Sequence, residues 1–565
     1  MRTAAVVAMA ATILLLASIT PTFDFDEALY RRIAEEMKQS HEWSTPTWDG
    51  RPFYEKPPTY IWSIVAASAL VDRDAAHVSV LAARLPSAVC SFVTIALLSW
   101  FWRRRARDYA STFGTENDHS TRWLFSPLLP ALAYGTGLFA IGGSATVMLD
   151  PMLTMFLAVP LLMFSAAWLR RAERLELTMA ESIAAGLAMA AATTVKGLVG
   201  IVLPALALVV HAALVGPRMK RIRETAMAAS RAFAIALAGA GVAYAAMYRL
   251  AGAAFFREFF IRQHLIRATS PIQGHRGPFF FHLAIILLIG GPLVAFVLRL
   301  LPRRGSGFAR WGFPLTWSLT VIAFYSALAT KLPNYTWPVW PALAMTLCIL
   351  LMRGAAVDAA PAGRSARAAS YLCLVPVILM TAAIGTGADR LVSVHNGPRS
   401  QAMTAAFDPV PLAVRAAFVA IAIILVVEVI AIALFGHARD RRSPFVWRSI
   451  AATCVMNCAV LALIVVVIVP FVDDALRGPL IRLSHDASAD HLAGGDLTTI
   501  GLFSPTVSSS YDGGRLLQVG HVAAQRPTAG QHLRLAPSWR ADACAAPAFV
   551  VVRRDHYVML CVNRR

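Results

Sequence analysis

The chain has 565 residues, of which 57% are hydrophobic and only 15% charged, and its mean hydropathy is +0.59. A soluble protein carries about 25% charged residues, so this composition excludes an ordinary soluble enzyme. The net charge of +20 would suggest nucleic acid in a soluble protein. Here the basic residues cluster in short loops between apolar runs, a pattern that topology and anionic headgroups explain better than base recognition.

Apolar runs long enough to cross a bilayer recur along the chain. The first, at 3–20, follows Arg2, and "ASITPT" is a poor cleavage site, so we expect an uncleaved helix and not a signal peptide. The run 57–71 is short and opens with two prolines, and we expect it to be re-entrant or interfacial. Thirteen spans are predicted, at 3–20, 79–101, 124–142, 149–169, 179–195, 197–215, 229–250, 279–300, 311–329, 335–352, 369–387, 412–435 and 448–469.

Basic residues fall in every second loop between these spans. The basic loops are "WRRRAR" (102–107), "RRAER" (170–174), "RMKRIR" (218–223), "LPRRG" (301–305), "RSAR" (364–367) and "HARDRR" (437–442). Loops rich in lysine and arginine stay in the cytoplasm. We therefore expect the N-terminus inside and the tail from about 470 outside, in the periplasm of a bacterium.

The tail differs in composition from the rest of the chain. Residues 497–504 and 548–562 are rich in β-branched residues, which predicts strands. The fold class expected is a polytopic α-helical membrane domain at 1–470, with interfacial helices at about 22–78, followed by a small periplasmic α/β domain at 471–565. Cys544 and Cys561 lie in this tail and would be able to pair in an oxidising compartment.

This topology gathers acidic, basic and aromatic residues on the outer face, at helix ends. Charges at membrane depth are costly and tend to be functional when they face a cavity. The residues concerned are Asp26, Glu27, Glu55, Lys56, Asp150, Lys196, His275, Arg276, Lys331 and Tyr335.

Each of these residues also has an ordinary structural interpretation. Asp150 precedes a proline and would cap a helix, and Asp26 with Glu27 would match the dipole of an amphipathic helix. Lys196 would snorkel to the interface. His275 and Arg276 would be interfacial anchors, and Tyr335 would belong to an aromatic belt with Trp337 and Trp340.

Several acids and bases on one face nevertheless favour a site that holds a phosphate and activates an acceptor. Lysine and arginine would bind the phosphate. Carboxylates would bind a divalent metal or act as a base. Aromatic residues suit sugar rings or lipid tails, so the set indicates a lipid-phosphate substrate.

The order of motifs "FDFDEALYRRIAEEM", "GRPFYEKPPTYIW", "RLPSAV", "MLDPMLTMF", "VKGLVGIVLP", "HRGPFFF" and "KLPNYTWPVWPALA" resembles polyprenyl-phosphate-dependent glycosyltransferases with the GT-C fold. Among these the chain is most similar to the lipid A 4-amino-4-deoxy-L-arabinose transferase family, a relative of protein O-mannosyltransferases. The resemblance covers most of residues 20–345. It implies inverting transfer of a sugar from undecaprenyl phosphate to lipid A phosphate at the periplasmic face of the inner membrane.

The resemblance also implies roles for individual residues. Asp26, Glu27 and Asp150 match acids expected to be catalytic, and Glu55 matches a residue that would help bind a divalent metal. Tyr30, Tyr54 and Tyr60 would line the substrate. The donor phosphate would be bound by Lys56, Lys196, His275, Arg276, Lys331 and Tyr335.

The acceptor and the role of Asp26 stay open at this stage. A hydroxyl acceptor needs a general base, as in a protein O-mannosyltransferase or another surface-glycan transferase. A lipid A phosphate is already anionic near neutral pH and needs orientation. A transporter or flippase would bury polar residues at mid-membrane in inverted repeats, and a non-catalytic surface assembly protein is a further alternative. The partners expected are a polyprenyl-phosphate sugar, lipid A or another periplasmic acceptor and membrane lipids, with no nucleic acid and a monomeric chain.

Overall fold

The computed structural model describes residues 25–563 with gaps. The predicted span 3–20, parts of the spans 369–387 and 448–469, and Cys544 lie outside the described residues. The gaps are 74–76, 117–118, 138–139, 141, 144, 173, 217, 272–274, 302–306, 355–373, 387–409, 438–455, 457–458, 461, 490–495, 501–515, 520–530, 538–548 and 556–557.

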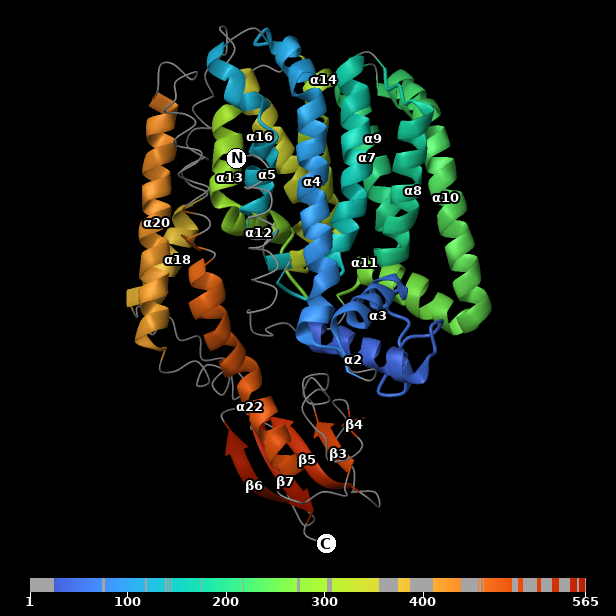
Figure 1. Ribbon diagram of the computed structural model, residues 1–565, viewed down its shortest axis with the longest axis vertical. Coiled ribbons are helices and arrows are strands. Elements are labelled where there is room, and N and C mark those ends of the chain that lie inside the picture. The colour runs from blue at the N-terminus through green and yellow to red at the C-terminus, as the bar shows by residue number, and fades with distance from the viewer. Residues whose placement is uncertain are drawn as a thin grey trace.

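The first described segment lies across one end of a helical bundle (Figure 1). Helix α2 spans Phe25–Ser40, with Asp26 and Glu27 in its first turn and Lys38 in its last, as the helix dipole favours. A short hairpin of β1 (Thr47–Trp48) and β2 (Arg51–Pro52) follows. Helix α3 (Thr59–Val71) begins directly after the two prolines and contacts α2.

Long helices follow in antiparallel succession. They are α4 (Val80–Phe113), α5 (Leu128–Gly135), α7 (Asp150–Arg170), α8 (Met179–Lys196), α9 (Val199–Leu214) and α10 (Arg218–Phe256), with the 3-10 helix η1 (His119–Phe125) between α4 and α5. With 34 residues, α4 is about 51 Å long, whereas the hydrocarbon core is about 30 Å thick. The basic run 102–107, expected in a loop, therefore lies on a helical extension beyond the membrane.

Among the described residues, five helices are long and apolar enough to cross a membrane. They are Val80–Phe113, Asp150–Arg170, Met219–Thr269, Pro333–Gly354 and Leu412–Ile430. The protein is thus a multi-pass helical membrane protein. Other predicted spans correspond to shorter helices, such as α9 with 16 residues, and the number 13 stays a prediction.

The second half of the bundle is more broken. Its elements are the π-helix η2 (Arg257–Ile266), α11 (Arg267–Thr269), α12 (Phe281–Ile289), α13 (Gly291–Leu300), α14 (Phe308–Trp311), α15 (Phe313–Ala327), η3 (Pro333–Val339), α16 (Trp340–Gly354), α18 (Val375–Thr386) and α20 (Leu412–His437). The predicted single span 279–300 divides at Gly290. The Trp340 ring packs so closely there that a Cβ atom would lie 2.2 Å from it.

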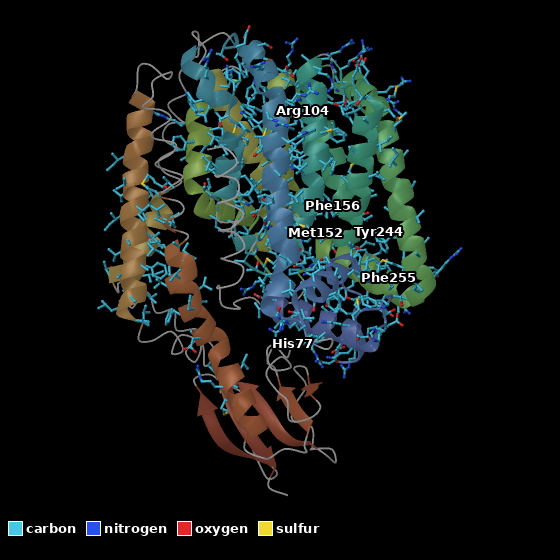
Figure 2. The ribbon with its side chains drawn as sticks, in the orientation of Figure 1. His77, Arg104, Met152, Phe156, Tyr244 and Phe255 are labelled. Carbon is cyan, nitrogen blue, oxygen red and sulfur yellow. The ribbon has the colours of Figure 1, made fainter. Side chains whose placement is uncertain are left out.

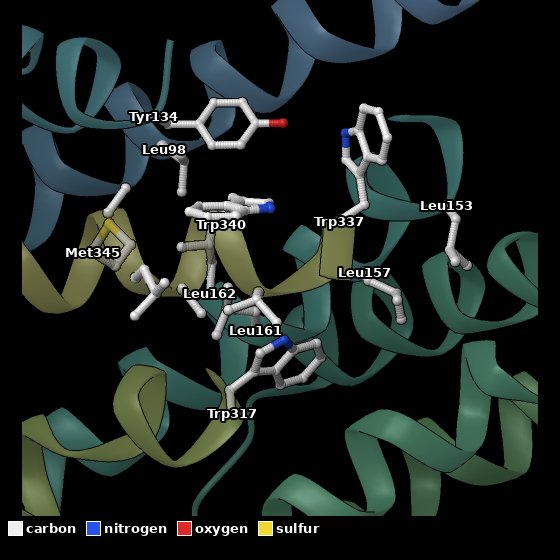
Figure 3. Packing of buried hydrophobic residues seen from close by; sticks show 14 of the residues in the cluster. Leu98, Tyr134, Leu153, Leu157, Leu161, Leu162, Trp317, Trp337, Trp340 and Met345 are labelled. Carbon is white, nitrogen blue, oxygen red and sulfur yellow. The ribbon is translucent and has the colours of Figure 1, made fainter. Parts of the chain in front are cut away.

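Helix α16 forms the centre of the core. All of its residues from Trp340 to Met352 are buried, as expected for a helix that is apolar on every side. Figure 3 shows Trp340 near Tyr134 and Leu98, with Trp317 beyond it near Leu161. The indole Nε1 of Trp317 donates to the Pro338 carbonyl at 3.1 Å, which ties α15 to η3.

The C-terminal part contains a mixed sheet. The π-helix η5 (Ile464–Ile468) leads into α22 (Val469–Ala489), which crosses the predicted domain boundary at 470 and contacts β5, β6 and β7. The strands β3 (Asp496–Ile500), β4 (Leu516–Val519), β5 (Gln531–Pro537), β6 (Phe549–Asp555) and β7 (Val558–Asn563) form a sheet in the order β4-β3-β5-β7-β6. Figure 1 shows this sheet beyond the end of the bundle that carries α2 and α3.

Candidate functional site

Charged residues from five segments converge where α2 and α3 cover the bundle. Asp26 begins α2, Glu55 and Lys56 precede α3, and Asp150 begins α7. Lys196 ends α8. Asp26 interacts electrostatically with the other four residues, Glu55, Lys56, Asp150 and Lys196. Lys56 also interacts with Arg267 of α11. The structure thus brings these five residues together at the α2–α3 end of the bundle, with Arg267 in addition.

Asp150 is held by partners on both of its carboxylate oxygens. Its side chain is 2% exposed, Oδ1 accepts from Lys196 Nζ, and Oδ2 accepts from Asn334 Nδ2 at 2.9 Å. Lys196 Nζ also lies 4.9 Å from the centre of the Tyr335 ring, a cation–π contact. The capping interpretation is wrong, because the N-cap of α7 is Leu149 and no side chain caps the helix. Both oxygens of Asp150 instead accept from partners on other elements.

Asp26 lies among charges of both signs. Burial raises the pKa of Asp26 above its ordinary value, Asp150 and Glu55 raise it further, and Lys56 and Lys196 oppose the shift. A carboxyl in such a place changes protonation nearer to neutral pH than a surface aspartate does. This is the electrostatic setting in which acid–base residues are found.

Lys56 has a pKa below that of an ordinary lysine. Burial lowers the pKa of Lys56 to about 8, the neighbouring Arg267 contributes in the same direction, and Glu55 and Asp26 oppose. Its Nζ donates to the Glu55 carbonyl oxygen at 3.2 Å. An anion bound near both groups would offset the repulsion between Lys56 and Arg267, so the chemistry of this pair suits a phosphate.

Arg267 was missed by the sequence analysis. Its Nη1 donates to Gln263 Oε1 at 2.8 Å, and Gln263 is in turn held by Glu258 at 3.1 Å. Its Nε atom is buried and has no hydrogen-bond partner among the described residues. A usable signal was present, because Arg257, Arg262 and Arg267 follow one another in a loop expected outside, where basic residues should be scarce.

The three tyrosines lie in two different places. Tyr30 and Tyr60 are 6% and 1% exposed and meet edge to face at 5.6 Å, and Tyr30 also contacts Phe53. Burial raises the pKa of Tyr30 well above its ordinary value, and the nearby Asp26, Glu55 and Asp150 add to the shift, so Tyr30 borders the acids. Tyr54 instead packs against Phe255, 6.1 Å away, near the lower end of α10 in Figure 2.

Lys331, His275 and Arg276 are arranged differently from the central cations. The Lys331 ammonium donates to the carbonyls of Tyr325, Ser326 and Leu328, which closes the end of α15. The Lys331 backbone N–H donates to the His275 carbonyl at 3.0 Å. Arg276 is exposed, and His275 Nδ1 is buried without a partner among the described residues. Tyr335 stacks on Tyr325 at 4.6 Å.

Glu27 turns away from the cluster. Its Oε1 accepts from Arg84 Nε at 2.6 Å, and the two side chains are 1% and 0% exposed. Arg84 lies in α4, within the quoted "RLPSAV" motif, but was not singled out in the sequence. The two acids at the start of α2 therefore have different surroundings. Asp26 faces the cluster of charged residues, and Glu27 faces α4.

A metal site at Glu55 finds no support in the donor set. In the part of the chain that the structure describes, no group of three or more His, Cys, Asp or Glu side chains gathers. Among the acids that act on Asp26, Asp150 already binds Lys196 and Asn334. A divalent metal at Glu55 stays a prediction.

Comparison with known proteins supports the resemblance seen in the sequence, although no family model matches the chain. An undecaprenyl phosphate-alpha-4-amino-4-deoxy-L-arabinose arabinosyl transferase of Pseudomonas fluorescens is 27% identical over 387 residues, covering 66% of this chain and 59% of the relative. The transferase of the same name from Pectobacterium carotovorum is 29% identical over 378 residues, covering 64% and 61%. The chain thus matches about three fifths of the length of these curated relatives.

A solved structure shares the fold. ArnT from Cupriavidus metallidurans bound to undecaprenyl phosphate superposes with a TM-score of 0.66 at 19% identity, over 99% of this chain and 98% of that one. Its apo form superposes equally well. The resemblance inferred from the motifs is confirmed, and the chain has the polytopic helical GT-C fold of that transferase.

Proposed function

We propose that the protein is an inverting glycosyltransferase that moves 4-amino-4-deoxy-L-arabinose from undecaprenyl phosphate to a lipid A phosphate. The observation that carries this proposal is the convergence of two cations, Lys56 and Arg267, and two acids, Asp26 and Asp150, at one end of a GT-C bundle. The names of the curated relatives and the lipid bound to the solved ArnT structure support the sugar and the donor.

The cations serve the leaving group. During transfer the bond between the anomeric carbon and the donor phosphate oxygen breaks, and the bonding electrons go to the phosphate. Lys56 and Arg267 stabilise this developing charge, and fixed cations in a site with little water do so strongly. Lys196, held by Asp150, adds positive charge near Asp26.

The acids serve the acceptor and the sugar. An oxygen of the lipid A phosphate attacks the anomeric carbon from the opposite face and forms the new bond, and the oxocarbenium-like transition state gains from nearby carboxylates. Because such a phosphate is already anionic near neutral pH, Asp26 need not remove a proton from it. Asp26 then orients the aminosugar or the acceptor. With a hydroxyl acceptor it would be the general base.

The location proposed is the periplasmic face of the inner membrane. Figure 2 shows Arg104, from the basic run 102–107, toward the opposite end of the bundle from His77, which lies beside α2 and α3. By the positive-inside rule this orientation puts the α2–α3 end outside. Cys561 of β7 is disulfide-bonded, which suits an oxidising compartment for the sheet.

Lipid A masses test this function. Lipid A from cells with and without the gene is compared, together with cells that express the Asp26→Asn variant at equal level. The proposal predicts a mass gain of one aminopentose that needs the gene and is lost in the variant. Unchanged lipid A with a gene-dependent loss of sugar from a secreted protein or another surface glycan would support the alternative acceptors. Transport of lipid without sugar transfer would contradict an enzyme.

A further inference from the structure

One face of α4 connects both acids of the site to a common support. Arg84 and Ser87 are three residues apart on α4, so their side chains lie on the same side of the helix. Arg84 binds Glu27, the residue that follows Asp26. Ser87 binds the backbone of Met148, two residues before Asp150.

The Arg84 contact fixes the beginning of α2. The Nε to Oε1 distance is 2.6 Å and neither side chain is more than 1% exposed. A buried ion pair contributes little net stability because desolvation offsets the attraction, and its best-attested use is to set registry. Consecutive helical residues point about 100° apart, so anchoring Glu27 to α4 directs Asp26 toward Lys56 and Asp150.

The Ser87 contact fixes the approach to α7. Its hydroxyl donates to the Met148 carbonyl at 2.8 Å and accepts from the Met148 N–H at 3.3 Å. The same oxygen lies 2.7 Å from the Tyr60 hydroxyl, so it also joins α3. The Ser87 and Tyr60 side chains are buried, so loss of a partner there leaves a buried polar group unsatisfied, which is costly.

We propose that Arg84 and Ser87, with Glu27, are positioning residues that hold Asp26 and Asp150 at a fixed separation across the reacting sugar. Glu27 acts through Asp26 and does not touch substrate. This inference rests on the proposed transferase function. It assigns to the site a set of supporting residues that contact neither the donor nor the acceptor.

The test uses Glu27→Gln and Ser87→Ala in the full-length protein, in detergent or vesicles, with undecaprenyl phosphate–aminoarabinose as donor. Small displacements of reacting groups cost about 10²-fold in rate, so kcat should fall by about this factor in Glu27→Gln and by less in Ser87→Ala. The KM for the donor and the binding of undecaprenyl phosphate should stay near the wild-type values, because Lys56 and Arg267 are untouched. The double variant Glu27→Arg with Arg84→Glu, which restores the pair, should recover part of kcat.

Glu181→Gln is the matched control. Glu181 pairs with Arg170 at the same 2.6 Å distance and joins α7 to α8, but at the other end of these helices. It should melt at a slightly lower temperature and keep its kcat.

A cryo-EM structure of Glu27→Gln separates this inference from the proposed function. The inference expects the first turn of α2 and the Asp26 side chain to shift relative to Asp150, whether or not the wild type transfers this sugar. If Asp26 keeps its place and kcat is unchanged, the positioning role is overturned. If the wild type transfers no sugar while Asp26 shifts in the variant, the proposed function fails and the positioning role stands. Should Glu27→Gln not fold, the same comparison is made with Ser87→Ala.

Discussion

The two ends of the helical bundle both carry many charges, and they use them in different ways. At the α2–α3 end, two ion pairs, Glu27–Arg84 and Asp150–Lys196, join distant segments and are buried. At the opposite end, Arg105 pairs with Asp108 three residues away, with 31% and 47% of their side chains exposed. Arg171 and Glu176 there are 57% and 38% exposed.

This difference indicates that the exposed charges set the orientation in the membrane, whereas the buried charges form the proposed site. Exposed pairs cost little and contribute little, so the basic end needs only the sign of its charge to remain on one side of the membrane. Buried pairs are expensive to assemble, and their geometry matters more than their number. Substitutions at the α2–α3 end should therefore change activity, and the same substitutions at the basic end should not.

The largest effect is expected for Asp26→Asn. Acid–base and orienting groups of this kind contribute about 10²–10⁴-fold to rate, and the substitution removes the charge with almost no change in volume. Transfer should be lost while the yield and melting temperature of the protein stay near the wild-type values. Asp108→Asn at the basic end is the control, and it should retain full activity. Equal effects of the two substitutions would remove the distinction between the ends.

Removal of one phosphate-binding cation should come next. Lys56→Met or Arg267→Met takes away one of the charges proposed to stabilise the leaving group, and loss of one such group costs about 10²–10³-fold in rate. Binding of undecaprenyl phosphate should weaken in both variants. Arg105→Met serves as the control, and kinetics in vesicles with titrated donor give the measurement. Unchanged lipid binding in Arg267→Met would refute the phosphate role of Arg267.

The Asp150–Lys196 pair should show strong coupling. Asp150→Asn or Lys196→Met alone leaves a buried charge without its partner, which costs about 3–5 kcal/mol in stability. The double variant should be more stable than the sum of the single effects predicts. The same cycle on Arg105 and Asp108 should give a coupling energy below about 1 kcal/mol. Thermal melts in detergent measure both cycles, and coupling of similar size at the two ends would contradict their assignment.

The pH dependence should be the mildest test. Lys56 binds phosphate only when protonated, and because its pKa is lowered to about 8, kcat/KM should fall as the pH rises through about 8. Asp26 acts as a carboxylate, and because its pKa is raised, the acid limb should begin above the pH range of an ordinary aspartate. In the alkaline limb, kcat should decline later than kcat/KM, since bound phosphate keeps Lys56 protonated. Lys56→Arg should move the alkaline limb upward.

Much of the site could be predicted because topology sorts charges by side. Alternating basic loops put Asp26, Lys56, Asp150 and Lys196 on one face, and these residues converge. Arg267 escaped notice because it is one of several arginines in the same loop, and the sequence does not say which of them reaches Lys56. Arg84 was not identified because the sequence does not indicate the partner of a charged residue inside an apolar helix. Its partner, Glu27, lies 57 residues away in the chain.

The fold was predicted better in kind than in detail. Hydropathy detects the length of an apolar run, but it does not reveal that the span 279–300 divides at Gly290, where Trp340 packs closely. It also cannot tell that Lys331, an isolated cation in the sequence, closes a helix end with its ammonium. Such uses depend on contacts between segments far apart in the chain.

The central claim is that the buried charges at the α2–α3 end transfer a sugar from a polyprenyl phosphate. The most direct measurement incubates the purified protein in vesicles with undecaprenyl phosphate–aminoarabinose and lipid A, and follows both lipids by mass spectrometry. We predict that lipid A gains one aminopentose as an equal amount of undecaprenyl phosphate is released, and that Asp26→Asn does neither while Asp108→Asn does both. Release and transfer that persist in Asp26→Asn, or that the wild-type protein does not perform, would contradict the account.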